Sequence, residues 1–353
     1  MPELLELLRH RLDMKRKETT MNILKKIFLT LLFPVLMFLV MLLITNSSPV
    51  CHVNGVNIFL GADLVRFIIL NTCMMVCIAL AIWLQMKNGR FDFSTGSIMV
   101  ITSIIAGNVG YANRSVLVAL VLSVVCAVGF SVIGALLYVY GRLPIIISSI
   151  AITLVYESLT YLVFGGQGIA SFYPEPQLNI FGRVPLILIP TVVAVLVFAV
   201  YDKFSVAGKK GKVLSNNQAA GVNIGLDEKK NTIICYVFSG IIIGMGSLIY
   251  VSQNSVGAQS GLTTTGVMFS YIAPVFMGMF VGLASNDVIG IIVSSIAISI
   301  MSYGLNCLNL GAGGWQNIIF GAFVMCFYSL SSQLDKIQRL LEKVKGNDKV
   351  HTA

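Results

Sequence analysis

Long apolar runs separated by short polar stretches fill the chain from residue 27 to residue 333. A helix that crosses a bilayer needs about 20 mostly apolar residues, and about ten of the runs approach or reach that length. We predict helices at residues 27–44, 64–86, 95–109, 115–140, 144–164, 184–201, 232–251, 267–283, 288–306 and 315–333. The pattern therefore predicts an all-α, polytopic integral membrane protein of about ten transmembrane helices, possibly arranged as an inverted five-plus-five repeat.

The third run is short and follows the polar stretch NGRFDFSTGS at residues 88–97. Either Asp92 or Ser94 can cap a helix whose first turn includes Gly96 and Ser97. A short, Gly-interrupted span is typical of a broken or re-entrant helix, which we predict near 88–109. The start of such a helix offers N–H donors to an oxygen-rich solute, whereas an ordinary N-cap in a loop is the alternative reading.

Composition strengthens the membrane assignment. Hydrophobic residues make up 56% of the 353 residues and charged residues only 11%, compared with roughly 25% charged residues in soluble domains. This excludes a soluble enzyme, a nucleic-acid-binding module and a disordered scaffold. The net charge of +9 is explained by basic residues in cytoplasmic loops, so it does not call for nucleic acid.

The distribution of basic residues tests the number of spans. With ten spans and a cytoplasmic N-terminus, 21 of the 24 basic residues fall on the cytoplasmic side, and Arg66, Arg114 and Arg183 are the exceptions. Nine or eleven spans would put one of the two basic ends on the wrong side. We therefore expect both termini in the cytoplasm.

This map divides the chain into three parts. An amphipathic cytoplasmic segment is predicted at 1–26, with a disordered basic tail as the alternative. The transmembrane permease domain is predicted at 27–333 and contains a long cytoplasmic loop at 202–231. A cytoplasmic tail follows at 334–353.

The chain lacks the motifs of an enzyme. It has no GxxxxGK[ST] phosphate loop, no HExxH motif and no cluster of Cys and His residues, so we expect no ATP site, no cofactor and no metal in this chain. We interpret the seven cysteines as small apolar residues without a disulfide framework. The absence of a nucleophile–base pair favours a pore or a carrier over a membrane enzyme.

Polar residues within the spans are the candidates for a solute path. Glu157 lies well inside the fifth span, where a charge costs several kcal/mol and usually faces an interior or a water-filled path. A structural acid paired with another helix is the alternative. By intramembrane polarity or by position in a motif, the candidate path residues are Asn71, Asp92, Ser94, Glu157 and Asn306.

The long loop contains SNNQAAGVNIG at Ser215–Gly225, which predicts a short helix that Gly221 could end. A cytoplasmic helix with small and polar residues is a natural dock for a partner protein. A solvated connector is the alternative.

Four segments resemble motifs of one family. The stretch at 88–97 resembles the family motif Gly-Gly-Ile-Asp-Leu-Ser-Val-Gly-Ser, and GRLPIIISSIAITL at Gly141–Leu154 matches the start of a later helix. The segment Ser215–Gly225 is similar to the cytoplasmic Asn-x-x-Ala-Ala-x-x-x-Gly-Ile segment, and Tyr303–Val324 is similar to the closing Asn-Gly-Leu-Asn-Leu-Leu motif. Over roughly residues 60–335, the chain thus resembles the permeases of ATP-binding-cassette (ABC) importers of the ribose and simple-sugar type, a group that includes branched-chain amino acid and nucleoside permeases.

The resemblance implies residue roles. Ser215–Gly225 would be the coupling helix that meets the ATPase, with the motif residues Asn216, Asn217, Ala219, Ala220, Gly221 and Gly225. The amino-acid branch usually has Asn-Phe-Ala-His-Gly where this chain has Asp92-Phe93-Ser94-Thr95-Gly96, which favours a sugar. The family often has Arg-Gly where this chain has Glu157-Ser158, a departure that allows a different solute or a non-identical partner permease.

The resemblance also implies partners and a location. These are ATP-hydrolysing subunits, a second permease chain in a homodimer or heterodimer, an extracytoplasmic solute-binding protein and the lipid bilayer. The location is the bacterial plasma (inner) membrane. A nucleoside or another small polar solute is the alternative cargo, and a secondary carrier driven by an ion gradient is the alternative class.

Overall fold

The computed structural model describes residues 30–53, 56–282, 286–311, 315, 318–323, 325–326 and 329. Eight helices in these ranges are long and apolar enough to cross a membrane, or up to nine when a bent pair is counted as one span. The prediction of a polytopic, helical membrane protein is therefore confirmed. The predicted segments 1–26 and 334–353 and nine of the 19 residues of the tenth predicted span lie outside the described residues.

The main elements follow the apolar runs of the sequence. The helices are Thr30–Ser47, α2 (Asp63–Lys87), α3 (Thr95–Ala112), α4 (Val116–Gly141), α5 (Ile145–Leu162), α6 (Leu188–Ala199), α7 (Val206–Asn216), α8 (Gln218–Asn223), α9 (Glu228–Gln253), α10 (Thr263–Gly282) and α11 (Asp287–Cys307). Short helical turns are η1 (Pro49–Cys51), η2 (Ile58–Leu60), η3 (Val163–Gly166) and the π-helical η4 (Val200–Phe204). Two strands of two residues, β1 (His52–Val53) and β2 (Val56–Asn57), pair antiparallel.

The chain forms two compact units. The larger unit comprises residues 60–275, and the smaller unit combines the described residues before 60 with those after 275. In the smaller unit, the Phe59 ring lies 5.6 Å from Phe38 of the first helix and 5.8 Å from Tyr303 of α11. Met41 packs on Gly304 of α11. Aromatic and thioether contacts thus join the first described helix to α11, although they are far apart in sequence.

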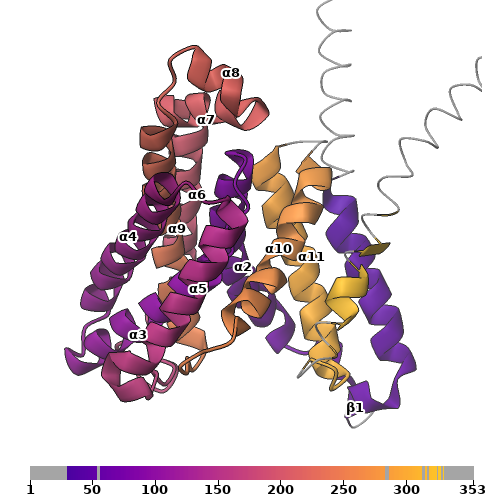
Figure 1. The fold of residues 1–353 in the computed structure, drawn as a ribbon. Coiled ribbons are helices and arrows are strands. Elements are labelled where there is room, and N and C mark those ends of the chain that lie inside the picture. Colours follow the sequence, from indigo (N-terminus) through magenta and orange to yellow (C-terminus); the bar gives the residue numbers. More distant parts are fainter. Residues whose placement is uncertain are drawn as a thin grey trace, which may run out of the picture. The chain divides into compact units, whose positions relative to one another are not determined.

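Helix α9 is the centre of the larger unit. It packs against α2, α3, α4 and α6, and Figure 1 shows α7 and α8 lying beyond the ends of α6 and α9. Gly240 and Gly244 face α4 so closely that a Cβ atom on either would come within 2.7 Å of an α4 Cα atom. This GxxxG spacing lets two helix backbones approach, which is how helices associate without a hydrophobic driving force between them.

The broken helix expected near 88–109 takes a different form. Residues 88–94 are non-helical, but α3 then runs without interruption for 18 residues. A strong bend lies elsewhere, where Leu188–Phe204 and Val206–Asn216 meet at 71°. The bend follows η4, and Ser205 caps α7 by accepting a hydrogen bond from the Ala207 N–H at 3.1 Å.

We predict that Gly244→Ala lowers the stability of the purified protein by about 1–3 kcal/mol, because the added methyl group would overpack the contact with α4. The measurement is the midpoint of thermal unfolding in detergent. Gly129→Ala is the matched control, since it adds the same methyl group to a helix at a position with no atom within 4 Å. Equal midpoints for the two variants would contradict the assigned packing.

Candidate functional site

The starts of α3 and α10 lie side by side. Gly96, in the first turn of α3, touches the backbone of Thr264 so closely that a Cβ atom there would collide with the Thr264 carbonyl oxygen. Two helix N-termini, each carrying a partial positive charge, therefore meet in the interior of the larger unit.

Asp92 stabilises the turn that leads into α3. Its Oδ1 accepts hydrogen bonds from the Ser94 N–H at 2.8 Å and from the Ser94 hydroxyl at 2.7 Å. Ser94 occupies the N-cap position, but its hydroxyl makes no cap bond to the first turn. The sequence predicted a cap from Asp92 or Ser94, and the structure instead has an Asp92–Ser94 turn placed before the helix.

Glu157 plays the corresponding part at α10. This carboxylate is 1% exposed. Its Oε2 accepts from the Leu262 N–H at 2.7 Å, and its Oε1 accepts from the Thr264 N–H at 2.8 Å and the Thr264 hydroxyl at 2.6 Å. Three donors and the positive end of a helix therefore stabilise the buried charge. These contacts support a structural role for Glu157 rather than direct contact with a solute.

The polar segment 88–94 is buried between α2 and α3. Arg90 is 5% exposed, and its Nη1 donates to the Thr232 hydroxyl in α9 at 2.9 Å. Its Nε and Nη2 atoms have no hydrogen-bond partner among the described residues, and neither does the side-chain amide of nearby Asn231. The segment is thus tied to α9 by a guanidinium group whose hydrogen-bonding capacity is only partly used.

The same segment is joined to η4 and α7. Asn88 donates to the Leu84 carbonyl oxygen at 2.7 Å and accepts from the Tyr201 hydroxyl at 2.9 Å. Gly211 of α7 packs directly against the Asn88 side chain, where a Cβ atom would collide with it. A displacement of α7 toward this segment would therefore also displace the Asn88 side chain.

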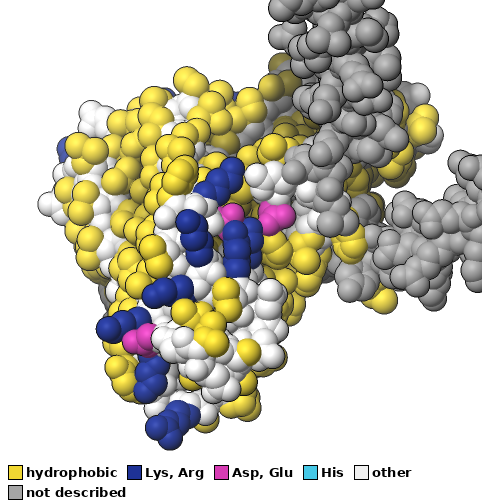
Figure 2. Space-filling view, turned by 90° about the horizontal axis from the view of Figure 1, so that it is seen from above, with side chains coloured by type: hydrophobic (Ala, Val, Ile, Leu, Met, Phe, Trp, Pro, Cys, Tyr) yellow, Lys and Arg dark blue, Asp and Glu magenta, His cyan; other side chains and the backbone are white. Residues whose placement is uncertain are grey.

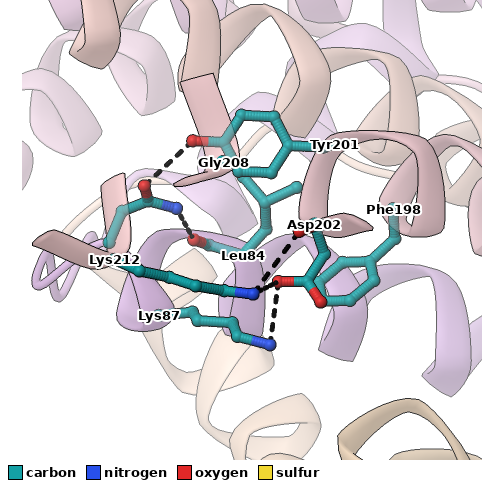
Figure 3. A pocket seen from close by; sticks show the side chains of 8 residues that line it. Leu84, Lys87, Phe198, Tyr201, Asp202, Gly208 and Lys212 are labelled. Carbon is teal, nitrogen blue, oxygen red and sulfur yellow. Dashed lines mark hydrogen bonds and ion pairs between the residues drawn. The ribbon is translucent and has the colours of Figure 1, made fainter. Parts of the chain in front are cut away.

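An ion cluster reinforces this contact. Asp202 lies between two lysines, with Oδ1 at 2.9 Å from Lys87 Nζ and 3.0 Å from Lys212 Nζ. Figure 3 shows both ammonium groups directed at the carboxylate, beside Phe198 and Tyr201 in a small cleft. Lys87 ends α2, Asp202 belongs to η4 and Lys212 belongs to α7, so one carboxylate joins three elements.

The helix pair α7–α8 lies in the long polar loop, where the sequence predicts a short helix. Asn217 caps α8 by accepting from the Ala220 N–H at 3.0 Å. Gly221 was expected to end this helix, but it lies inside α8 and is buried against Leu214. The turn after the helix contains Gly225, whose φ of +87° suits glycine. Ala219 and Ala220 are exposed.

Charge and apolar surface are combined at this end of the molecule. Val222 is 47% exposed and Ile224 is 72% exposed. Figure 2 shows Lys and Arg side chains gathered on the same face, and the exposed lysines of α7 and α9 there are Lys209, Lys210, Lys212, Lys229 and Lys230. Exposed apolar side chains and lysines therefore occur together at this end of the larger unit.

The other predicted path residues are not part of this site. Asn71 is half-buried in α2, and its side chain makes no hydrogen bond within the described ranges. Asn306 is exposed and belongs to the smaller unit. The residues that sequence reasoning missed are Asn88, Arg90, Tyr201, Asp202 and Thr264. Asn88 and Arg90 lie in the polar stretch before α3, and this stretch could have marked them as site residues. No sequence pattern marked Asp202 or Thr264.

Within the described ranges, the protein is thus a helical, polytopic membrane protein with a helix pair, α7–α8, beyond the ends of its apolar spans. No group of three or more metal-ligating side chains occurs in the described part of the chain. The family model described as branched-chain amino acid transport system / permease component matches residues 64–328. The chain belongs to this permease family and is a multi-pass membrane protein.

Several curated proteins are similar to the chain. The probable ABC transporter permease protein y4mJ of Sinorhizobium fredii is 22% identical over 71% of this chain and 76% of its own length. The ribose import permease protein of Escherichia coli is 20% identical over 73% of this chain and 82% of its own length. The autoinducer 2 import system permease protein LsrC of Photorhabdus luminescens is 22% identical, with coverages of 78% and 82%. No solved structure matches the chain significantly.

We predict that Asp202→Asn loosens α7, because the two lysines lose the charge that they share. A loss of about 1 kcal/mol would raise the locally open population roughly fivefold. Trypsin cleavage after Lys209 and Lys210, followed by mass spectrometry, measures this population. The control is Asp227→Ser, which removes an exposed 3.9 Å ion pair but keeps an N-cap residue for α9. Equal cleavage rates for the Asp202→Asn and Asp227→Ser variants would show that the Lys87–Asp202–Lys212 cluster does not hold α7 in place.

We predict that Glu157→Gln destabilises the start of α10. A glutamine side chain has one acceptor oxygen, and its NH₂ group would face the N–H of Leu262 or Thr264, at a cost of about 1–3 kcal/mol. The thermal midpoint should fall by roughly 5 °C, whereas exposed Glu175→Gln should leave it unchanged. An unchanged midpoint with altered solute selectivity would make Glu157 a path residue instead.

Proposed function

We propose that this chain is the membrane-spanning permease subunit of an ABC importer and that its solute is a sugar. The family match and the three similar permeases support this assignment, and two of them carry names that refer to ribose or autoinducer 2. A nucleoside or another small polar solute is the alternative cargo. An extracytoplasmic solute-binding protein delivers the solute, and a second permease chain completes the path.

ATP is bound and hydrolysed by partner ATPase subunits, which dock on α7–α8 from the cytoplasm. The observation that carries this proposal is the continuous series of contacts from α8 to the start of α3. Gly221 fixes α8 on Leu214 of α7, Gly211 of α7 rests on Asn88, and Asp92 sets the turn into α3. The protein sits in the bacterial plasma membrane with both termini in the cytoplasm.

Transport requires two arrangements of the solute path. ATP can shift the equilibrium between these arrangements only if the ATPase subunits bind one of them more tightly than the other. Segment 88–94 is the element that we assign to this change. The Nε and Nη2 atoms of Arg90 have no hydrogen-bond partner among the described residues, so an arrangement that supplies one would be favoured. A small push on α7 can therefore select between two packings rather than bend a rigid helix.

A secondary carrier driven by an ion gradient is the rival class. It would use a membrane-embedded carboxylate as an ion or proton site. Glu157 is poorly suited to that role because its two oxygens already accept three hydrogen bonds from Leu262 and Thr264.

The test is sugar uptake by the chain and its ATPase subunits in proteoliposomes, with Ala219→Asp as the variant. Ala219 is exposed on α8, so an aspartate there disturbs docking without disturbing the fold. We expect at least a tenfold loss of solute-stimulated ATP hydrolysis and weaker retention of the ATPase during purification. Gly257→Asp, which adds the same charge at an open site, should behave as wild type.

Two results would overturn the proposal. One is ATP hydrolysis by the purified chain alone. The other is uphill uptake by proteoliposomes that contain no ATPase subunit, which would identify a secondary carrier.

A further inference from the structure

The larger unit has a cleft of about 320 Å³ where the end of α4 meets the starts of α8 and α9. Its polar lining residues are Arg142, Gln218, Glu228 and Lys229. On the side of α4 the lining is apolar and aromatic and includes Tyr138 and Leu143. The cleft therefore combines apolar and charged groups at one end of the long helices.

The apolar side of the cleft continues into a surface that faces lipid. Only 22% of the apolar part of α4 is buried within the protein, the lowest share among the candidate spans of the described residues. Tyr140 near the end of α4 is 67% exposed, and Leu143 is 49% exposed. In a membrane-spanning protein such a helix contacts acyl chains, and a tyrosine near its end is typical of the level of the lipid headgroups. The cleft thus lies at that level.

Two cations in the cleft have no anionic partner. Arg142 and Lys229 are exposed, and neither makes an ion pair with any residue in the described ranges. The Lys229 ammonium lies 5.4 Å from the centre of the Tyr140 ring, a cation–π contact that holds it on the side of α4. Glu228, the single carboxylate among the lining residues, accepts a hydrogen bond from the Gln218 side chain. Two cations against one carboxylate leave the lining with a net charge of +1.

This combination favours an anionic phospholipid over other anions. A guanidinium group binds a phosphate through two parallel hydrogen bonds, and an ammonium group adds a compact charge beside it. The phosphate of phosphatidylglycerol is the only charge in its headgroup, whereas phosphatidylcholine brings a cation that Arg142 and Lys229 would repel. A soluble phosphate would gain nothing from the exposed apolar surface of α4, whereas the acyl chains of a lipid would be held beside it.

We propose that this cleft binds the headgroup of an anionic phospholipid. Arg142 and Lys229 bind the phosphate, and the acyl chains lie along α4 beside Tyr140 and Leu143. The bound lipid connects the turn after α4 to the starts of α8 and α9, so that the stability of this end of the unit depends on lipid composition. Binding of this kind requires only that the chain spans a bilayer, and it does not depend on which solute is carried.

The experiment is native mass spectrometry of the purified full-length chain, titrated with phosphatidylglycerol or with phosphatidylcholine of the same acyl chains. Wild type should bind phosphatidylglycerol roughly tenfold more tightly or better, and in R142E/K229E the Kd for this lipid should rise by roughly tenfold or more. The neutral variant R142Q/K229Q should lose the preference as well, which separates loss of the cations from added repulsion.

The matched control is K209E/K210E, which makes the same change of charge on exposed lysines of α7 outside the cleft. Its Kd for phosphatidylglycerol should stay within about twofold of wild type, because only the charges in the cleft touch the headgroup. The thermal unfolding midpoint of each variant in lipid-free detergent checks that the variant is folded. Added phosphatidylglycerol should raise this midpoint in wild type and in K209E/K210E, but not in R142E/K229E.

Three results would overturn the proposal, and none of them bears on the solute. Equal losses of affinity in R142E/K229E and K209E/K210E would mean that surface charge in general attracts the lipid. Competition by glycerol 3-phosphate as strong as that by phosphatidylglycerol would identify a site for soluble anions instead. If R142E/K229E keeps its affinity for the lipid but no longer co-purifies with the ATPase subunits, the cleft belongs to that protein interface.

Discussion

This structure depends on hydrogen-bond partners for one polar, non-helical segment that lies within an otherwise apolar protein. Residues 88–94 interrupt the helices between Lys87 and Thr95, and Asn88, Arg90, Asp92 and Ser94 in this segment are all buried. In an apolar environment each unpaired polar group costs free energy, so such a break is tolerated only where neighbouring elements supply partners. Thr232, Tyr201 and the Leu84 carbonyl oxygen supply them here.

The same requirement explains why distant elements are mechanically linked. Each partner of the buried segment lies on a different helix, so the hydrogen bonds that stabilise the break also tie α2, η4 and α9 together. The Lys87–Asp202–Lys212 cluster extends the link to α7. It is only partly exposed, with the Asp202 side chain 16% accessible, so solvent screens it less than an ion pair on the open surface.

Two buried acids, Asp92 and Glu157, show how one physical rule is used twice. Asp92 precedes α3 and Glu157 holds the start of α10, and each accepts backbone N–H groups near a helix N-terminus. The sequence marked both as candidate path residues, Glu157 because a charge within a span is costly and Asp92 because of its position in the motif at 88–97. The structure meets that cost from within the protein, by helix ends that meet at Gly96 and Thr264.

The amino-acid sequence by itself determined the membrane class, the apolar helices and the short helix of the long polar loop, because these follow from local hydropathy and capping residues. It placed the end of α8 at Gly221 and did not find the bend between η4 and α7, since local signals do not show which glycine is buried under Leu214 or where a helix bends. Only the tertiary structure decided which polar groups meet. Arg90 and Thr232 are 142 residues apart, and Glu157 and Thr264 are 107 apart, so their pairing depends on how the helices pack and on no pattern along the chain.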